Sequence, residues 1–277
     1  MEPKVYWLLE DGIFEDSTSA LKASIEKHGY EWKMVDFPHL LLSENYAKSL
    51  FPPESCVIYR GGIAAAMRIQ RTCDWIPGPY FSHKNFSFLN YYSYLGRQML
   101  SNNYMVTTFS DLKTRKDWLL KIFGGSTQRV FVKPESSLKA FRGFVLSWCS
   151  WESQLKNLNL DPSLPVVVGD VCIPEKEWRL VVADGKVISA TQYMAGDATD
   201  LSPGAPEDVL EYGGWVAAQA YAPDPVWTLD IGCAKSELYV IEPNSFSCAG
   251  LYACPTDPIV ETVSNLAKAE WLDIMGA

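Results

Sequence analysis

The stretch 226–244, VWTLDIGCAKSELYVIEPN, decides how the second half of the chain is expected to fold. Its first six residues and the six from Glu237 are rich in β-branched and aromatic side chains, which predicts two strands. The short polar segment 234–236 lies between these strands and is typical of a hairpin turn. We therefore expect two consecutive strands to pair here through a tight turn.

Three oxygen-bearing side chains are expected to meet on one face of this hairpin. Side chains alternate along a strand, so Glu242 and Asn244 share a face. A turn centred near Ser236 places Asp230 opposite Glu242 on that face. Two carboxylates this close require a cation between them, and oxygen ligands favour magnesium over zinc. The other interpretation is a polar face that simply meets water, and the spacing alone leaves both open.

The composition indicates a globular protein with a large core. Of the 277 residues 48% are hydrophobic, and ten Trp and fourteen Tyr are among them. This excludes a disordered chain and is enough for one large domain or two modest ones. No apolar run reaches the about 18 residues that a membrane span requires. The first residues lack the layout of a signal peptide, so we expect a cytoplasmic protein.

Charge, cysteines and histidines exclude several classes of function. The net charge is −9, and Lys and Arg are not clustered, so nucleic acid is not expected as the main partner. Since no apolar run is long enough to span a membrane, no membrane is expected as a partner either. The seven cysteines form no C-x-x-C pair, which is typical of reduced thiols. The three histidines lie far along the chain from the polar motifs, so neither a histidine-based triad nor a zinc site is expected.

The first third of the chain is predicted to be α/β. A helix is expected to begin near Ser17 and to run through Lys27, with Gly29 in the position of a C-cap glycine. Gly61-Gly62 follows a strand and opens a second helix; such a turn could bind an anion at the helix N-terminus, or serve only as a tight turn. The strands of this region are expected at 4–9, 30–35 and 56–60.

The rest of the chain is predicted to be α+β with antiparallel sheets, because strands outnumber crossover helices. A linker-like segment is expected at 75–83. Helices are expected at 86–100, at 111–123 with Ser110 as cap, at 206–221 with a break at Gly213-Gly214, and from Asp257 onward. Strands are expected at 129–133 and 165–173, with a hairpin at 177–193 around Asp184-Gly185.

Basic residues of the middle third are candidates for phosphate binding. Lys133 ends an apolar strand before Pro134, a placement that can fix one positive charge in a cleft. Lys139 and Gly143 belong to a small basic loop that could cover a triphosphate. The alternative for both lysines is an ordinary solvated position.

Arg179 lies in the middle of a predicted strand, where an unpaired charge is costly. Either Glu177 pairs with it, or the guanidinium group binds a phosphate or carboxylate. The chain contains no P-loop and no kinase-type motif, so those nucleotide-binding folds are excluded.

Taken in order, these segments resemble the ATP-grasp superfamily. More narrowly, the chain is similar to a divergent clade that includes a eukaryotic cell-division-control protein of translation-initiation-factor assembly and many bacterial and phage members. The resemblance spans roughly residues 105–255. Its segments are Val132-Lys133-Pro134, Lys139-Ala140-Phe141-Arg142-Gly143, Glu177-Trp178-Arg179-Leu180-Val181-Val182, and Asp230 with Glu242-Pro243-Asn244 and Gly250-Leu251-Tyr252.

The resemblance implies an α+β ATP-grasp fold, in which two α+β subdomains with antiparallel sheets sandwich ATP, preceded by an N-terminal α/β pre-ATP-grasp domain. The implied limits are 1–104 for the N-terminal domain and 105–277 for the ATP-grasp domain. Within the latter, 105–168 would carry the lysines and 169–277 the metal ligands.

The resemblance also implies a role for individual residues. The expected nucleotide-binding residues are Lys133, Lys139, Gly143, Asp170, Val171, Glu177 and Arg179. Of these, Lys139 and Arg179 are the expected catalytic residues, and Asp170-Val171 would border the adenine. Asp230, Glu242 and Asn244 would hold one or two magnesium ions, so ATP and magnesium are the expected cofactors. Arg60 is a further guess, in a region that would face the acceptor.

The implied activity is an ATP-dependent carboxylate–amine ligase, in which a carboxylate attacks the γ-phosphate and an amine opens the acyl-phosphate to an amide. A peptide or protein is one substrate that the resemblance allows. Such chemistry needs positioning and charge neutralisation but no protein nucleophile. Two rivals stay open: an ATP-binding assembly factor that grips a partner protein without turnover, and an ATP-grasp kinase of a small molecule.

Overall fold

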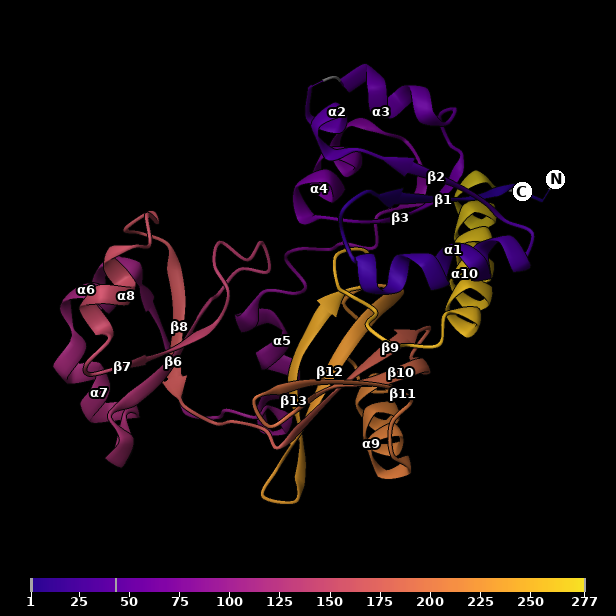
Figure 1. Cartoon of the computed structure of the whole chain (residues 1–277). Coiled ribbons are helices and arrows are strands. Elements are labelled where there is room, and N and C mark those ends of the chain that lie inside the picture. The colour runs from indigo at the N-terminus through magenta and orange to yellow at the C-terminus, as the bar shows by residue number, and fades with distance from the viewer. Residues whose placement is uncertain (1, 43, 277) are drawn as a thin grey trace. The chain divides into compact units, whose positions relative to one another are not determined.

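The computed structural model describes residues 2–42 and 44–276, and their helices and strands are shown in Figure 1. The first residues were expected to lack the layout of a signal peptide, and one of them, Met1, lies outside these ranges. The described residues form three sheets. They divide into two compact units that do not follow chain order. Unit 1 contains the residues up to Ser82, Lys176–Ile231 and the residues from Glu242, and unit 2 contains His83–Glu175 and Gly232–Ile241.

The first sheet of unit 1 is parallel, which confirms the α/β prediction for the N-terminal region. Its strands lie in the order β2-β1-β3-β4. β3 is buried at every residue, as expected for a strand covered on both faces. The strands are β1 (Val5–Glu10), β2 (Glu31–Val35), β3 (Cys56–Arg60) and β4 (Ile76–Gly78). The helices between them are α1 (Glu15–Lys27), α2 (Phe37–Leu42), α3 (Glu44–Leu50) and α4 (Ile63–Thr72).

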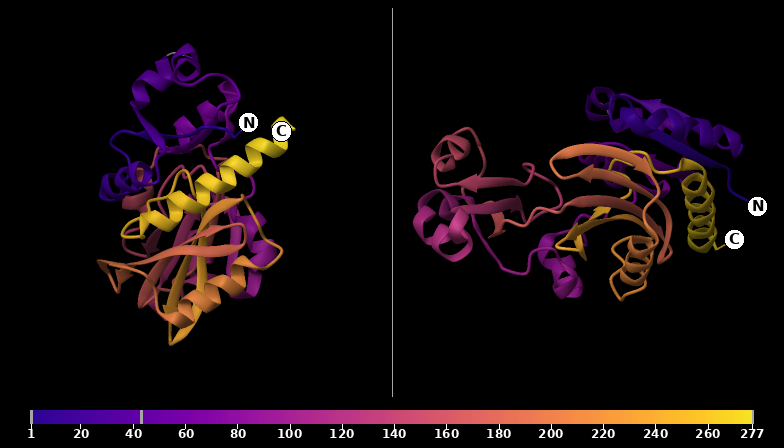
Figure 2. Two further views of the ribbon diagram at one scale, coloured as in Figure 1. Left: turned by 90° about the vertical axis from the view of Figure 1, so that its right-hand side faces the viewer. Right: turned by 60° about the horizontal axis from the view of Figure 1, so that its bottom comes forward.

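The five-stranded sheet contains both predicted hairpins. Its strands lie in the order β11-β10-β9-β12-β13, and α9 (Glu207–Ala217) packs along β9 and β10 (Figure 2). Both hairpin turns consist of two residues with positive φ, at Asp184-Gly185 and Lys235-Ser236, as a type I′ turn requires. The strands are β9 (Lys176–Ala183), β10 (Lys186–Ala195), β11 (Ala198–Pro203), β12 (Val226–Ala234) and β13 (Glu237–Ser245).

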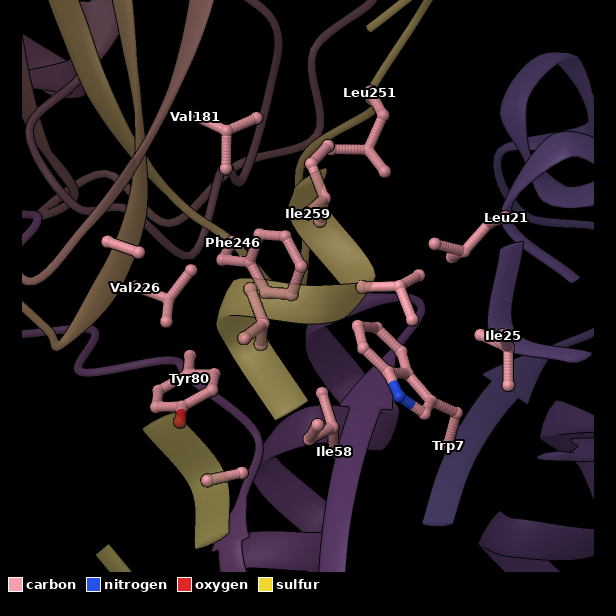
Figure 3. Packing of buried hydrophobic residues seen from close by; sticks show 14 of the residues in the cluster. Trp7, Leu21, Ile25, Ile58, Tyr80, Val181, Val226, Phe246, Leu251 and Ile259 are labelled. Carbon is pink, nitrogen blue, oxygen red and sulfur yellow. The ribbon is translucent and has the colours of Figure 1, made fainter. Parts of the chain in front are cut away.

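One hydrophobic cluster joins the two sheets of unit 1 to the last helix, α10 (Thr256–Met275). Trp7 of β1 is fully buried in it, and its indole nitrogen donates a hydrogen bond to Ser264 of α10 over 3.1 Å. Figure 3 shows Trp7 and Phe246 in this cluster, together with Ile259 of α10 and with Val181 and Val226 from the antiparallel sheet. The N-terminal strands and the C-terminal helix therefore share one core, which explains why they fall in the same unit.

Unit 2 is built on an antiparallel sheet with the order β5-β8-β6-β7. Leu120, Trp151 and Val168 belong to its separate core. Its strands are β5 (Tyr104–Thr108), β6 (Arg129–Pro134), β7 (Phe144–Ser147) and β8 (Pro165–Asp170). Its helices are α5 (Phe88–Leu95), α6 (Phe109–Thr114), α7 (Lys116–Phe123) and α8 (Trp151–Lys156), with single 3₁₀ turns at Gly96–Gln98 and Gly125–Thr127.

Several predicted boundaries were wrong. The helix expected at 111–123 is two helices that meet at Arg115, and its cap is Thr108, whose hydroxyl accepts from the Asp111 amide over 3.1 Å, rather than Ser110. α5 ends at Leu95 instead of continuing to residue 100. The segment expected as a linker contains β4, because its backbone pairs with β3.

The glycine pair in α9 does not break the helix as predicted. α9 continues through Gly213 and Gly214. A Cβ on Gly213 would lie 2.1 Å from Leu180 Cδ2, so this glycine permits close packing of the helix on the sheet. Two helices also begin earlier than predicted: α1 at Glu15 and α10 at Thr256.

None of the helices within 2–42 and 44–276 is long and apolar enough to cross a membrane. The domain limits expected at 104 and 105 stay a prediction, since compact units and family domains are different divisions of a chain.

Candidate active site

Arg179 and Asp230 form a buried ion pair in unit 1. Arg179 Nε lies 2.8 Å from Asp230 Oδ1 and Nη2 lies 2.6 Å from Oδ2, while Nη1 donates to the Gly250 carbonyl over 2.8 Å. Arg179 is 6% exposed and Asp230 is 2% exposed. Burial alone would lower the pKa of Arg179, but the adjacent Asp230 carboxylate raises it above its ordinary value. The predicted alternative of a Glu177–Arg179 pair was therefore wrong, because β12, the sheet neighbour of β9, supplies the partner.

Asn244 joins the two carboxylates that the hairpin was predicted to bring together. Its side-chain nitrogen lies 3.2 Å from Asp230 Oδ2 and 3.1 Å from Glu242 Oε1. Two carboxylates and an amide are oxygen donors of the kind that magnesium prefers, so the residues fit such an ion. This trio has only two acidic members, and the described part of the chain contains no group of three or more His, Cys, Asp or Glu that could hold a metal. The assignment of these residues as magnesium ligands stays a prediction.

Glu177 belongs to the same cluster through its charge and not through a bond to Arg179. Its carboxylate accepts a hydrogen bond from the Tyr193 hydroxyl. Burial raises the pKa of Glu177, the nearby Asp230 and Glu242 carboxylates raise it further, and the Tyr193 hydrogen bond opposes them. The cluster is thus rich in negative charge, which a bound cation would relieve.

Arg179 lies beside a pair of stacked tyrosines, and sequence reasoning assigned neither of them to the site. The rings of Tyr193 and Tyr252 stack with centroids 5.0 Å apart, and the Arg179 guanidinium lies 4.9 Å from the Tyr252 centroid and 5.6 Å from that of Tyr193. Such cation–π contacts hold a guanidinium group in place. Tyr252 stood in a segment that carried the resemblance, but nothing in the sequence distinguishes these two among fourteen tyrosines.

Lys133 is held by aromatic residues of unit 2. Its ammonium nitrogen lies 2.6 Å from the Tyr91 hydroxyl oxygen, 4.9 Å from the Phe88 ring centroid and 5.3 Å from that of Tyr91. Phe88 and Tyr91 are α5 residues that sequence reasoning also missed, since α5 precedes β6 by a long stretch of chain.

The remaining candidates of unit 2 lie in two segments. Lys139 is in the β6–β7 loop with a positive φ of 51°, and a Cβ on Gly143 would lie 2.7 Å from the Phe131 ring, so a larger residue there would force that ring to move. Asp170, at the end of β8, accepts hydrogen bonds from the Asn103 amide at 2.9 and 3.0 Å, with Val171 next to it. The structure thus gathers Glu177, Arg179, Asp230, Glu242 and Asn244 in unit 1, and assigns Lys133, Lys139, Gly143, Asp170 and Val171 to unit 2.

Arg60 supports the loop after β13. It is buried, donates to the carbonyls of Phe246 and Ala249, and lies over the Phe14 and Phe246 rings. Burial lowers its pKa to about 10. The two buried arginines, Arg60 and Arg179, therefore both donate to carbonyls of one loop.

The glycine turn before α4 does meet an anion, and the chain itself supplies it. The Gly62 amide donates to Glu10 Oε2 over 2.8 Å, and the Tyr59 hydroxyl donates to the same carboxylate. A carboxylate at a helix N-terminus satisfies the free amides and the helix dipole. The Gly61-Gly62 turn is therefore explained by a structural contact.

A family model for the ATP-grasp domain of R₂K clade family 2 matches residues 105–262, which is more than half of the chain. The chain therefore belongs to this family of the ATP-grasp superfamily. This confirms the resemblance to a divergent ATP-grasp clade and the predicted fold class. A comparison with curated proteins gives no match.

Solved structures share the fold over nearly the whole chain. D-cycloserine synthetase DcsG has a TM-score of 0.65 at 13% identity, covering 95% of this chain and 99% of that chain. The ATP-grasp ligase PsnB complexed with minimal precursor has 0.58 at 13% identity, covering 97% and 100%. D-alanine–D-alanine ligase from Bacillus anthracis has 0.55 at 13% identity, covering 97% and 99%. Likeness at this identity shows the fold alone.

Proposed function

We propose that this chain is an ATP-dependent ligase that joins a carboxylate to an amine through an acyl-phosphate. The observation that carries the proposal is the buried cluster in which Arg179 and Asn244 bind Asp230, and Asn244 also binds Glu242. In a member of an ATP-grasp family, convergent oxygen donors beside a buried guanidinium group suit the handling of a phosphoryl group through a bound cation.

The acidic cluster would hold magnesium. Bound magnesium supplies a positive charge that neutralises phosphate oxygens during phosphoryl transfer. Asp230, Glu242 and Asn244 would be its protein ligands, and Arg179 would keep the Asp230 carboxylate oriented. Solved structures of the fold include PsnB complexed with magnesium and ADP, and the Bacillus anthracis ligase complexed with ATP.

The basic residues of unit 2 would bind the phosphates. Lys133 and Lys139 would each place a compact positive charge on the triphosphate. Gly143 would let the backbone of its loop approach closely, and the backbone at Asp170-Val171 would border the adenine. Lys139 and Arg179 would act as catalytic residues by stabilising the charge of the transferred group.

The substrate is proposed as a peptide or protein with a reacting carboxylate or amine. PsnB, which shares the fold, was solved with its precursor peptide PsnA2 and AMPPNP. A cytoplasmic location belongs to the same proposal, supported by seven cysteines that form no disulfide among the described residues.

The test is ADP release by the purified protein with ATP, magnesium and a panel of peptide and small-molecule carboxylates and amines. Release that depends on an added amine, together with an amide product in mass spectrometry, is expected. Asp230→Asn and Glu242→Gln should abolish it, whereas Glu237→Gln, at the exposed start of the same strand, should not. ATP binding without turnover would instead favour an assembly factor, and a stable phosphoester product would favour a kinase.

A further inference from the structure

The ammonium group of Lys133, which belongs to β6, lies near aromatic side chains of α5. Phe88 contacts Tyr91 and Tyr104 through ring edges, with centroids 5.4 and 4.7 Å apart. Phe88 and Tyr91 are buried, and both lie near the Lys133 ammonium group. The lysine therefore ends among apolar ring surfaces, and the Tyr91 hydroxyl is a polar partner within that group.

α5 is fixed to the strand that carries the lysine. The Phe88 amide donates to the Glu135 carbonyl over 2.8 Å, and the Leu89 amide donates to Glu135 Oε1 over 3.2 Å. Glu135 directly follows β6. The position of Tyr91 relative to Lys133 is thus set at the helix N-terminus by hydrogen bonds from the first two amides of α5 to Glu135, one to its carbonyl and one to its carboxylate. This segment precedes the residues 105–262 matched by the family model.

We propose that Tyr91 is a positioning residue for the binding of a nucleotide polyphosphate, acting through Lys133. The lysine stem is long and flexible, so a fixed acceptor for one of its three N–H groups reduces the freedom lost when phosphate binds. The Phe88 and Tyr91 rings also attract the ammonium group, which keeps it beside the same acceptor. The inference rests on the proposed role of Lys133 and extends the nucleotide site to α5.

The experiment measures the affinities of the full chain for ATP and for adenosine, by competition with a fluorescent nucleotide in the presence of magnesium. The variants are Tyr91→Phe, Lys133→Ala and the double variant. Tyr92→Phe is the matched control, because its hydroxyl donates to Asn102 and lies on the same helix. Melting temperatures establish that each variant is folded.

Tyr91→Phe is expected to weaken the binding of ATP about tenfold, which corresponds to the loss of a charge-assisted hydrogen bond. The binding of adenosine should stay unchanged. The double variant should bind ATP no more weakly than Lys133→Ala alone, since Tyr91 acts through the lysine.

Equal losses of affinity for ATP and adenosine would show a merely structural role and overturn the inference. If Lys133→Ala weakens the binding of ATP but Tyr91→Phe does not, the inference fails while the proposed function stands. If Lys133→Ala leaves ATP affinity unchanged, the role of Lys133 in the proposed function fails, and Tyr91 loses its role with it.

Discussion

Arg179 and Asp230 meet through two parallel hydrogen bonds, of 2.8 and 2.6 Å, at a position where both side chains are almost completely buried. A buried ion pair fixes the direction of both groups, because neither can turn to water. The carboxylate proposed to hold magnesium is therefore already oriented in the protein alone.

Loss of one partner should leave the other charge buried and unpaired. Arg179→Ala is expected to lower the free energy of unfolding by about 3–5 kcal/mol. Urea unfolding without nucleotide or magnesium measures this. Arg115→Ala is the control, since Arg115 forms an exposed pair with Asp111 and should cost less than about 1 kcal/mol. Similar losses for the two variants would contradict the importance of burial.

Asn244→Asp should make the fold depend on a cation. The Asn244 amide donates to both Asp230 and Glu242, and an aspartate there would place a third carboxylate against them. We expect a lower melting temperature without magnesium and a larger rise on adding it than in the unaltered protein. Calcium and sodium at matched ionic strength separate specific binding from screening. A rise with magnesium no larger than that with sodium at matched ionic strength would count against a metal site.

The hairpins and their polar face could be predicted because the signals are local. Asp184-Gly185 sets one turn, and the alternation of side chains places Glu242 and Asn244 together. The partner of Arg179 could not be predicted, because it depends on which strand lies beside β9. Glu177 is two residues away in sequence, whereas Asp230 comes from a strand that follows β11 and α9. For the same reason, the contact between Tyr91 and Lys133 could not be predicted, because these residues belong to elements far apart in the sequence.

Asp224 should make stability depend on pH. Burial raises the pKa of this carboxyl group from 3.8 to about 7, Glu270 adds to the shift, and the Ser82 amide opposes it. Between these values the folded protein holds a proton that the unfolded chain releases, so stability falls as pH rises from 3.8 toward 7. Asp224→Asn keeps an acceptor for the Ser82 amide. It should raise the melting temperature more at pH 8 than at pH 5, and an equal effect at both would contradict the shift.

The two glycines of α9 should respond oppositely to alanine. A Cβ on Gly213 would lie 2.1 Å from the fully buried Leu180, whereas one on Gly214 meets nothing within 4 Å. Gly213→Ala is expected to destabilise by about 1–3 kcal/mol. Gly214→Ala should stabilise by about 1 kcal/mol through helix propensity. Chemical denaturation compares them, and a stabilised Gly213→Ala would refute the packing argument.

The cysteines should differ in reactivity. Cys149 and Cys172 are exposed, whereas Cys56 and Cys254 are buried, and burial raises the pKa of each buried thiol to about 12. A disulfide reagent at neutral pH should modify the exposed pair first, and the buried pair only after denaturant is added. Peptide mapping identifies the order, and early labelling of Cys254 would contradict it.

Unit 1 is assembled from three separate lengths of chain, and α10 packs on α1, β1, β3 and β4. A shortened chain that begins at residue 105 would therefore lack one side of the support for this last helix and expose apolar side chains that the β1–β4 region now covers. We therefore expect that the ATP-grasp region of this protein does not fold as an independent piece. Exchange of parts with a relative would have to carry the two ends of the chain together.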